Sequence, residues 1–168
     1  MANQLSFYAP RQYNKNRMVV LESEVFVWCK KIFQYVEQNR ENIVRYWIST
    51  YYTQTEEYAQ RKEYDGFLMT QAQEITQLFH TVNQQLQQNY VSTSVFQNVG
   101  EDRKDIGTPL LETVHCFHLV FTATLEYLFQ QLQQNKFTCS NSALYQYTLL
   151  LRKLEIQAEQ DLILGYMK

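Results

Sequence analysis

Glu112, His115 and His118 are the residues whose types and spacing could bind a metal ion. Glu112 and His115 form a Glu-x-x-His pair, and His118 follows three residues later. A di-iron site in a helical bundle needs two such pairs and two further glutamates. The sequence holds no second pair. We therefore interpret the histidines as residues at the edge of a packed helix, His118 as a buried, hydrogen-bonded one, and expect no metal site.

Nucleophilic catalysis also lacks its usual sequence motifs. No serine stands in a Gly-x-Ser-x-Gly elbow, and no glycine-rich string could cradle a phosphate. A cysteine–histidine pair formed in space, without a sequence signature, stays open. We expect no enzyme activity and name no catalytic residue, and a metal-binding helical enzyme is kept only as an alternative.

Arg103 is the strongest candidate for binding a ligand. Its guanidinium has a fixed fork that suits a carboxylate at the end of an apolar pocket. When the helix that follows is projected backwards, Arg103 falls on the same face as Val114 and Phe117. The competing interpretation, which the sequence alone favours, is a surface arginine paired with Glu101, Asp102 or Asp105. Arg45 is the second choice, although its position beside Ile43 and Trp47 points it to solvent.

A long apolar helix must position these residues. We predict that it runs from Pro109 to about Asn135, with Thr108 as its N-cap and Pro109 at its first position. Glu112 lies in its first turn and complements the helix dipole. The apolar residues recur at three- and four-residue steps, and they are Leu110, Val114, Phe117, Phe121, Leu125, Leu128 and Leu132.

The remaining chain also reads as helices, because it has few glycines and prolines. The predicted elements are a flexible arm over 1–18, helices over 18–38, 40–51, 56–64 (a surface helix) and 67–90, a break at Gly66, a loop or single turn over 91–99, and a last helix over 143–166 capped by Ser140 or Ser142. The first helix should bury Leu21, Val25, Trp28, Cys29, Ile32 and Val36, and the helix over 67–90 should bury Leu68, Ala72, Ile75, Phe79, Val82 and Leu86. One all-α domain over 19–168 follows.

Composition narrows the class of function. The 168 residues carry a net charge of -2, without the basic patch of a nucleic-acid-binding protein. No apolar run is long enough to span a membrane, and the N-terminus does not resemble a signal peptide. The odd count of three cysteines (Cys29, Cys116 and Cys139) suggests reduced thiols in a cytoplasmic protein. The aromatic share of 15% suits a large core or a ligand pocket.

The helix pattern suggests a globin-like arrangement with two long final helices. A haem protein needs an axial ligand, most often a histidine. In a globin this histidine lies before the penultimate long helix, but residues 91–99 contain none, and His80 lies on the preceding helix beside its apolar stripe. We therefore expect no haem. The pocket that haem would fill can still take a ligand, and its expected lining is Phe79, His80, Val114, Phe117 and Phe121.

Residues 103–112 also carry a resemblance to a known family. The string from Arg103 through Gly107 and Pro109 to Glu112 resembles the Arg-x₃-Gly-x-Pro-Leu-x-Glu segment of non-haem globin sensor domains, and Ile43-x₃-Trp47 fits their second helix. These domains stand at the N-terminus of stressosome proteins and some sensor histidine kinases. A free-standing domain of this kind is similar to the plasmid-encoded sporulation-inhibitory proteins of bacilli.

The resemblance implies a homodimer paired through the last two helices. It also implies a fatty acid in an apolar tunnel, with its carboxylate meeting an arginine and a chloride ion, and a role in inhibiting sporulation by titrating the signal of a sensor histidine kinase. Apolar residues off the main stripes would serve the dimer, and they are Leu119, Phe129, Leu149 and Leu150. The alternative is a helical interaction module with a filled core and no ligand.

Overall fold

The computed structural model describes residues 23–88 and 90–168, and every regular element in these ranges is a helix. The elements are α1 (Ser23–Thr50), the short 3-10 helix η1 (Tyr52–Gln54), α2 (Glu56–Arg61), α3 (Phe67–Gln87), α4 (Thr93–Asp105), α5 (Leu110–Gln133) and α6 (Asn141–Tyr166). This confirms the predicted all-α class. The predicted arm over 1–18 and the predicted helix start at Met18 lie outside the described residues.

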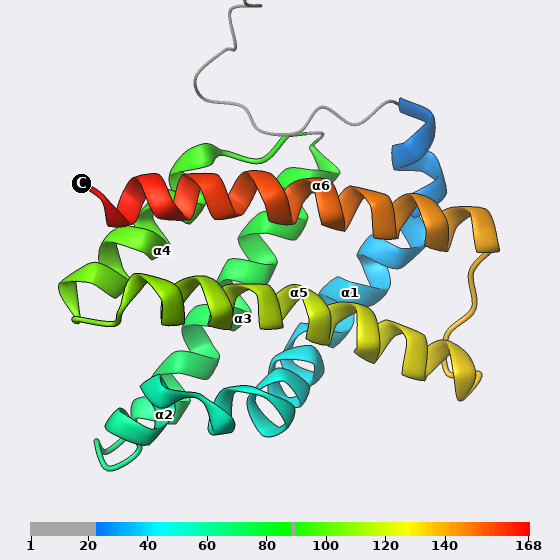
Figure 1. Cartoon of the computed structure of the whole chain (residues 1–168). Coiled ribbons are helices and arrows are strands. Elements are labelled where there is room, and N and C mark those ends of the chain that lie inside the picture. Colours follow the sequence, from blue (N-terminus) through cyan, green and yellow to red (C-terminus); the bar gives the residue numbers. More distant parts are fainter. Residues whose placement is uncertain (1–22, 89) are drawn as a thin grey trace, which may run out of the picture.

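Two antiparallel helices form one layer of the molecule, and two others cross behind them. Figure 1 shows α5 and α6 side by side, running in opposite directions, with α1 and α3 behind them. The short α2 lies near the beginning of α3, and α4 packs along the C-terminal half of α6. None of the helices in the described ranges is long and apolar enough to cross a membrane.

The prediction that the chain breaks between Gln38 and Arg40 is wrong, because α1 is one continuous helix of 28 residues. The segment contains neither glycine nor proline. Its polar side chains also bond along the helix: Asn39 Nδ2 donates to the Tyr35 carbonyl at 2.9 Å, and Arg40 donates to the Glu37 carbonyl at 3.0 Å. The polar residues around Asn39 therefore belong to the exposed side of one helix and do not mark a boundary between two.

Residues 91–99 are also not the loop or single turn that their β-branched composition predicted. Most of them belong to the 13-residue helix α4. The reason is tertiary packing, which overrides a weak local propensity. Gly100 on α4 and Gly165 on α6 bring the two backbones together, since a methyl group at Gly100 would overlap the Leu162 carbonyl oxygen, and one at Gly165 would overlap the Gln97 carbonyl.

Several predicted helix ends agree with the structure, and others shift. Gly66 does precede α3, with a left-handed φ of 74°, and Ser140 is the N-cap of α6, accepting from the Ala143 N–H at 3.1 Å. Thr108 is not the N-cap of α5: Pro109 occupies that position, and Leu110 begins the helix. The Thr108 side chain is buried and bonds to α2 instead. The last helix begins at Asn141, two residues earlier than predicted.

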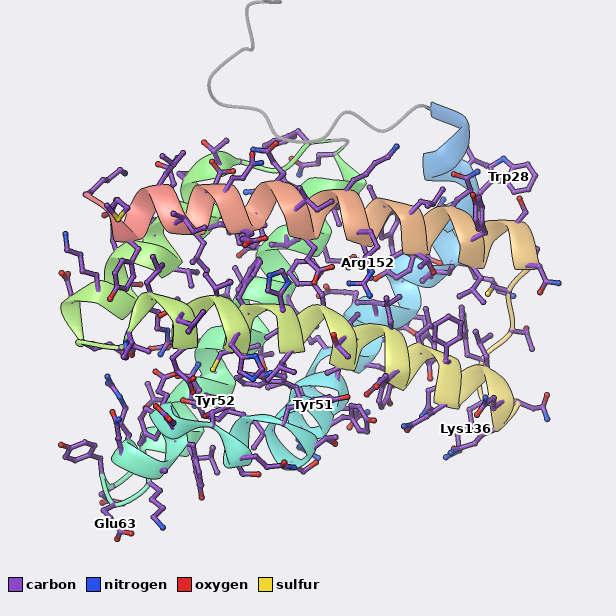
Figure 2. All side chains as sticks on the ribbon, viewed as in Figure 1. Trp28, Tyr51, Tyr52, Glu63, Lys136 and Arg152 are labelled. Carbon is purple, nitrogen blue, oxygen red and sulfur yellow. The ribbon has the colours of Figure 1, made fainter. Side chains whose placement is uncertain are left out.

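The core follows the predicted stripes with two exceptions. Phe117, Phe121, Leu125 and Leu128 of α5 are buried, and α1, α4 and α6 surround them. Trp28 is half-exposed and projects away from the start of α1 (Figure 2), so its predicted burial is wrong. Leu68 is exposed as well, because it lies at the N-terminal end of α3, outside the layers. Leu21 and Val25 lie outside the described side chains.

Candidate functional site

An apolar cavity of about 90 Å³ lies between the two helical layers, several times the space that one water molecule needs. Residues from α1, η1, α2, α3, α4, α5 and α6 line it. The apolar lining includes Val36, Ile75, Leu78, Phe79, Val82, Leu86, Phe96, Val99, Phe117, Val120, Phe121, Leu151, Leu154 and Leu162. All of these side chains are aliphatic or aromatic, so most of the cavity wall offers no hydrogen bond.

Two polar side chains of the wall, Glu57 and Gln71, meet at Arg103, whereas Asn83, Thr113 and Thr124 bond to backbone carbonyls elsewhere. Arg103 Nη1 lies 2.7 Å from Glu57 Oε1, and its Nη2 lies 3.1 Å from Gln71 Oε1 and 3.5 Å from Glu74 Oε2. The Arg103 side chain is 12% exposed and the Glu57 side chain 3%, so this ion pair is almost fully removed from water. Arg103 therefore pairs with Glu57 of α2, not with the predicted Glu101, Asp102 or Asp105.

A second layer of hydrogen bonds ties this pair to the start of α5. Thr108 Oγ1 donates to Glu57 Oε1 at 3.2 Å and accepts from Arg61 Nη2 at 3.1 Å. Arg61 also donates to the Ile106 carbonyl at 2.7 Å. Arg103 thus contacts both Glu57 and Glu74, and Arg61 joins the cluster through Thr108, so that two arginines stand near two glutamates. The prediction that residues 56–64 form a pure surface helix is wrong for Glu57.

Two buried donors on the cavity wall have no acceptor. Trp47 Nε1 and the Tyr52 hydroxyl are fully buried, and neither has a hydrogen-bond partner within the described part of the chain. Their rings stack with centroids 4.6 Å apart. Burial, and next the negative charge of Glu57, raise the pKa of Tyr52, which keeps its proton. The Glu57 carboxylate lies close enough to this hydroxyl to add to the rise as an acceptor, although the contact does not reach the geometry of a hydrogen bond. Figure 2 labels Tyr52, which follows the end of α1.

The structure brings together only some of the predicted site residues. Arg103, Phe79, Phe117 and Phe121 line the same cavity. Val114 instead packs against the main core as a half-buried residue and is not part of the cavity wall.

His80 and Arg45 lie elsewhere. His80 Nδ1 contacts Glu37 Oε1 at 2.6 Å outside the cavity. Arg45 is exposed and lies 4.0 Å from Glu41, so it is not placed to hold a head group in this cavity. Its position on the outer face of α1 agrees with the predicted orientation to solvent.

The Glu-x-x-His residues point to different partners. Glu112 Oε1 accepts from the backbone N–H groups of Glu56 and Glu57 at 3.0 and 3.3 Å, and so caps α2. His115 is exposed. His118 is half-buried, with Nδ1 2.7 Å from Glu155 Oε1 and Nε2 3.4 Å from Glu159 Oε2. Within the described residues no group of three or more acidic, histidine or cysteine side chains could hold a metal ion.

The buried thiols are poor nucleophiles. Burial, together with the charges of Glu112 and Glu57, raises the pKa of Cys116 to about 12, and burial raises the pKa of Cys29 to about 11. The thiolate is the reactive form of cysteine, so both side chains stay protonated and inert near neutral pH. All three cysteines are free, and Cys139 is half-buried.

Sequence reasoning missed most of the polar wall. Glu57 stands in a charged stretch, and Gln71 is itself polar and stands between Thr70 and Ala72, so neither carried a signal of burial. The sequence around Trp47 does not predict that its N–H lacks an acceptor within the described residues, because this depends on the groups that surround it in the fold. Comparison with protein-family models gives no match for the chain, and comparisons with curated proteins and with solved structures give none either.

Proposed function

We propose that this chain is a sensor domain with a non-haem, globin-like fold that binds a fatty acid or a closely related long-chain molecule between its helical layers. A largely apolar cavity whose wall includes the buried Arg103–Glu57 pair carries this proposal. Each buried methylene of a ligand contributes about 0.8 kcal/mol, so an acyl chain gains several kcal/mol from such a wall. The polar end around Arg103, Trp47 and Tyr52 would orient it. The domain acts by binding and not as an enzyme.

The size of the cavity sets a condition on binding. At about 90 Å³ it is smaller than the pockets of a few hundred cubic ångströms that enclose most small ligands. A long chain would be taken up only as α3 and α5 separate. Phe79 and Val82, both half-buried on α3, are the side chains best placed to move.

Native mass spectrometry and lipid extraction of purified protein test the proposal. We expect an acyl-chain molecule to co-purify, or to bind when added to delipidated protein. Val120→Phe, which fills the cavity wall, should abolish binding, and Val27→Phe on the exposed face of α1 should not. Protein that binds no acyl chain under any of these conditions would leave the alternative, an interaction module with a filled core.

We also propose, on the resemblance, that two copies pair through α5 and α6. Phe129 and Leu149 are exposed on these helices and support a contact there. Leu119 is half-buried against the core, and Leu150 is buried, so the prediction that Leu150 serves the interface is wrong. Light scattering should give twice the 20.2 kDa chain mass, and Phe129→Lys with Leu149→Lys should return it to the monomer.

The role in sporulation rests on the resemblance alone. If the domain withdraws a signal from a sensor histidine kinase, its expression in a sporulating bacillus should delay spore formation, and the cavity-filling variant Val120→Phe should not. An equal delay with both proteins would show that the effect does not depend on a bound ligand. The involvement of chloride stays a prediction, and binding measured with and without chloride tests it.

A further inference from the structure

The Trp47 indole and the Tyr52 hydroxyl are two donors that make no hydrogen bond within residues 23–88 and 90–168. Both side chains line the cavity, and both are nearly inaccessible to solvent, Trp47 at 1% and Tyr52 at 0%. Buried polar groups are almost always hydrogen-bonded, because a buried donor without an acceptor loses the hydrogen bond it made to water. An indole N–H can only donate. An acceptor inside the cavity would satisfy it.

The nearby guanidinium, in contrast, already has its partners. Arg103 donates to Glu57 and Gln71 at 2.7 and 3.1 Å, and Glu74 lies 3.5 Å away. Thr108 donates to the same Glu57 oxygen, which holds this carboxylate in place. A ligand carboxylate at this end would add a negative charge beside Glu57 in a site with little water. Two carboxylates in one buried site disfavour the ionisation of one of them.

We propose that the ligand ends in an uncharged oxygen acceptor, as in a long-chain alcohol or a fatty acid in its protonated form, and that Trp47 and Tyr52 donate to this oxygen. This inference rests on the proposed function, since it names the head group of the same ligand. In small-molecule sites a few placed polar groups fix orientation while apolar contacts supply affinity. Here the two unpartnered donors select the head group, and the Arg103–Glu57 pair excludes a charged one.

The first experiment compares dodecanol with dodecanoate on delipidated wild-type protein at neutral pH, by displacement of a fluorescent probe. Dodecanol should bind about tenfold more tightly, because burying the second carboxylate is unfavourable. Tighter binding of dodecanoate would overturn the inference and leave the proposed function intact. Failure of both compounds to bind would overturn the proposed function itself.

The second experiment removes the donors singly. Tyr52→Phe deletes a hydroxyl that lies near Glu57 but makes no hydrogen bond within the described residues, so the fold should be kept, while dodecanol affinity falls roughly threefold to tenfold. Trp47→Phe should weaken it similarly. Tyr51→Phe is the matched control, because the Tyr51 hydroxyl donates to Glu126 and does not line the cavity. Unchanged dodecanol affinity in both donor variants would overturn the inference and point to a trapped water as their acceptor.

A third variant tests why a charged head group is excluded. Glu57→Gln removes the negative charge that neutralises Arg103 and keeps a side chain of the same shape. The affinity for dodecanoate should then rise roughly tenfold relative to the affinity for dodecanol, since a ligand carboxylate can replace Glu57 as the partner of Arg103. Thermal unfolding would confirm that the variant is folded. A folded Glu57→Gln protein with the wild-type preference would show that Glu57 does not set the charge selectivity.

Discussion

Arg103 of α4 and Glu57 of α2 form an ion pair that joins positions 46 residues apart in the sequence, with Arg103 Nη1 at 2.7 Å from Glu57 Oε1. Both side chains are almost fully buried. The pair fixes α2, a helix of only six residues, against the rest of the molecule. It also closes the polar end of the cavity, so the same contact bears on stability and on ligand choice.

Removing one partner of this pair should be costly. We expect Arg103→Ala to lower the free energy of unfolding by about 3 kcal/mol, because Glu57 would be left charged and buried. Replacing both residues, as Arg103→Met with Glu57→Leu, should cost less than the single change. Urea unfolding of wild type, Arg103→Met, Glu57→Leu and the variant with both changes, taken as a double-mutant cycle, measures the difference.

The exposed pair of Arg45 and Glu41 is the control for that cycle. Its atoms are 4.0 Å apart, and both side chains are mostly in water. Arg45→Ala should change the free energy of unfolding by less than about 0.5 kcal/mol. If Arg103→Ala and Arg45→Ala had equal effects, the burial of the Arg103–Glu57 pair would have no energetic consequence, contrary to our expectation.

The glycines at the crossing of α4 and α6 should not accept a side chain. In Gly100→Ala the methyl group would meet backbone atoms of Leu162 and Tyr166, which cannot rotate away. We expect a loss of about 3 kcal/mol as α4 is pushed off α6. Gly66→Ala meets no atom and carries only the strain of its positive φ, about 1 kcal/mol. Denaturant unfolding of both variants should show this order, and the reverse order would contradict the close crossing.

Glu37 should make the protein less stable in acid. Burial alone would raise its pKa, but hydrogen bonds from His80 and Asn83 and the charges of His80 and Arg40 outweigh it, so the pKa of Glu37 is lowered. The contribution of Glu37 to the free energy of unfolding is therefore complete above its unfolded pKa of about 4.3. This contribution is lost as the pH falls through the lower pKa that Glu37 has in the folded protein. Thermal melts from neutral to acidic pH should show a shallower decline in Glu37→Gln than in wild type.

The exposed Glu41 of the same helix provides the comparison for the acid series. Glu41→Gln removes a carboxylate that is mostly in water, so its melting curve should follow that of wild type at every pH. A decline of the same steepness in Glu37→Gln and in wild type would mean that the contacts of Glu37 with His80 and Asn83 do not stabilise its charged form.

Asp161 should make the protein less stable as pH rises, which is the opposite of the effect of Glu37. It is buried on α6, its Oδ2 has no partner among the described residues, and Gln97 reaches its Oδ1 only at 3.4 Å. Burial raises its pKa above the unfolded value, so stability falls as pH rises through the native pKa. Asp161→Asn should thus stabilise by about 1 kcal/mol at neutral pH and by less in acid. A destabilised Asp161→Asn at neutral pH would contradict this.

Much of the fold could be predicted because its signals are local. The stripe that contains Phe117, Phe121 and Leu125 repeats with the period of a helix, and all three residues are buried as predicted. Gly66 takes the left-handed conformation that glycine alone adopts easily, and Ser140 caps α6 through its own side chain. These features depend on neighbours within a few positions along the chain.

The two errors in the predicted fold, at α1 and at α4, arise because local polarity and propensity do not by themselves decide where a helix begins and ends. α1 continues through Asn39 because nothing in that segment breaks a helix, and polar residues there are simply its exposed side. α4 forms because α6 offers a backbone surface to it: Gly100 fits against Leu162 and Tyr166, and Gly165 leaves room for Gln97. Local propensity is worth a fraction of a kcal/mol per residue, so such packing outweighs it.

The sequence by itself determined the all-α class, the apolar face of α5 and the choice of Arg103 as the candidate ligand-binding residue. Only the tertiary structure decided what Arg103 meets, because Glu57 and Gln71 come from other helices and carry no sign of burial in their own segments. The tertiary structure alone also leaves Trp47 and Tyr52 without a hydrogen-bond acceptor among the residues that it describes. A hydrogen bond needs two groups within about 3 Å, and folding decides which distant groups come that close.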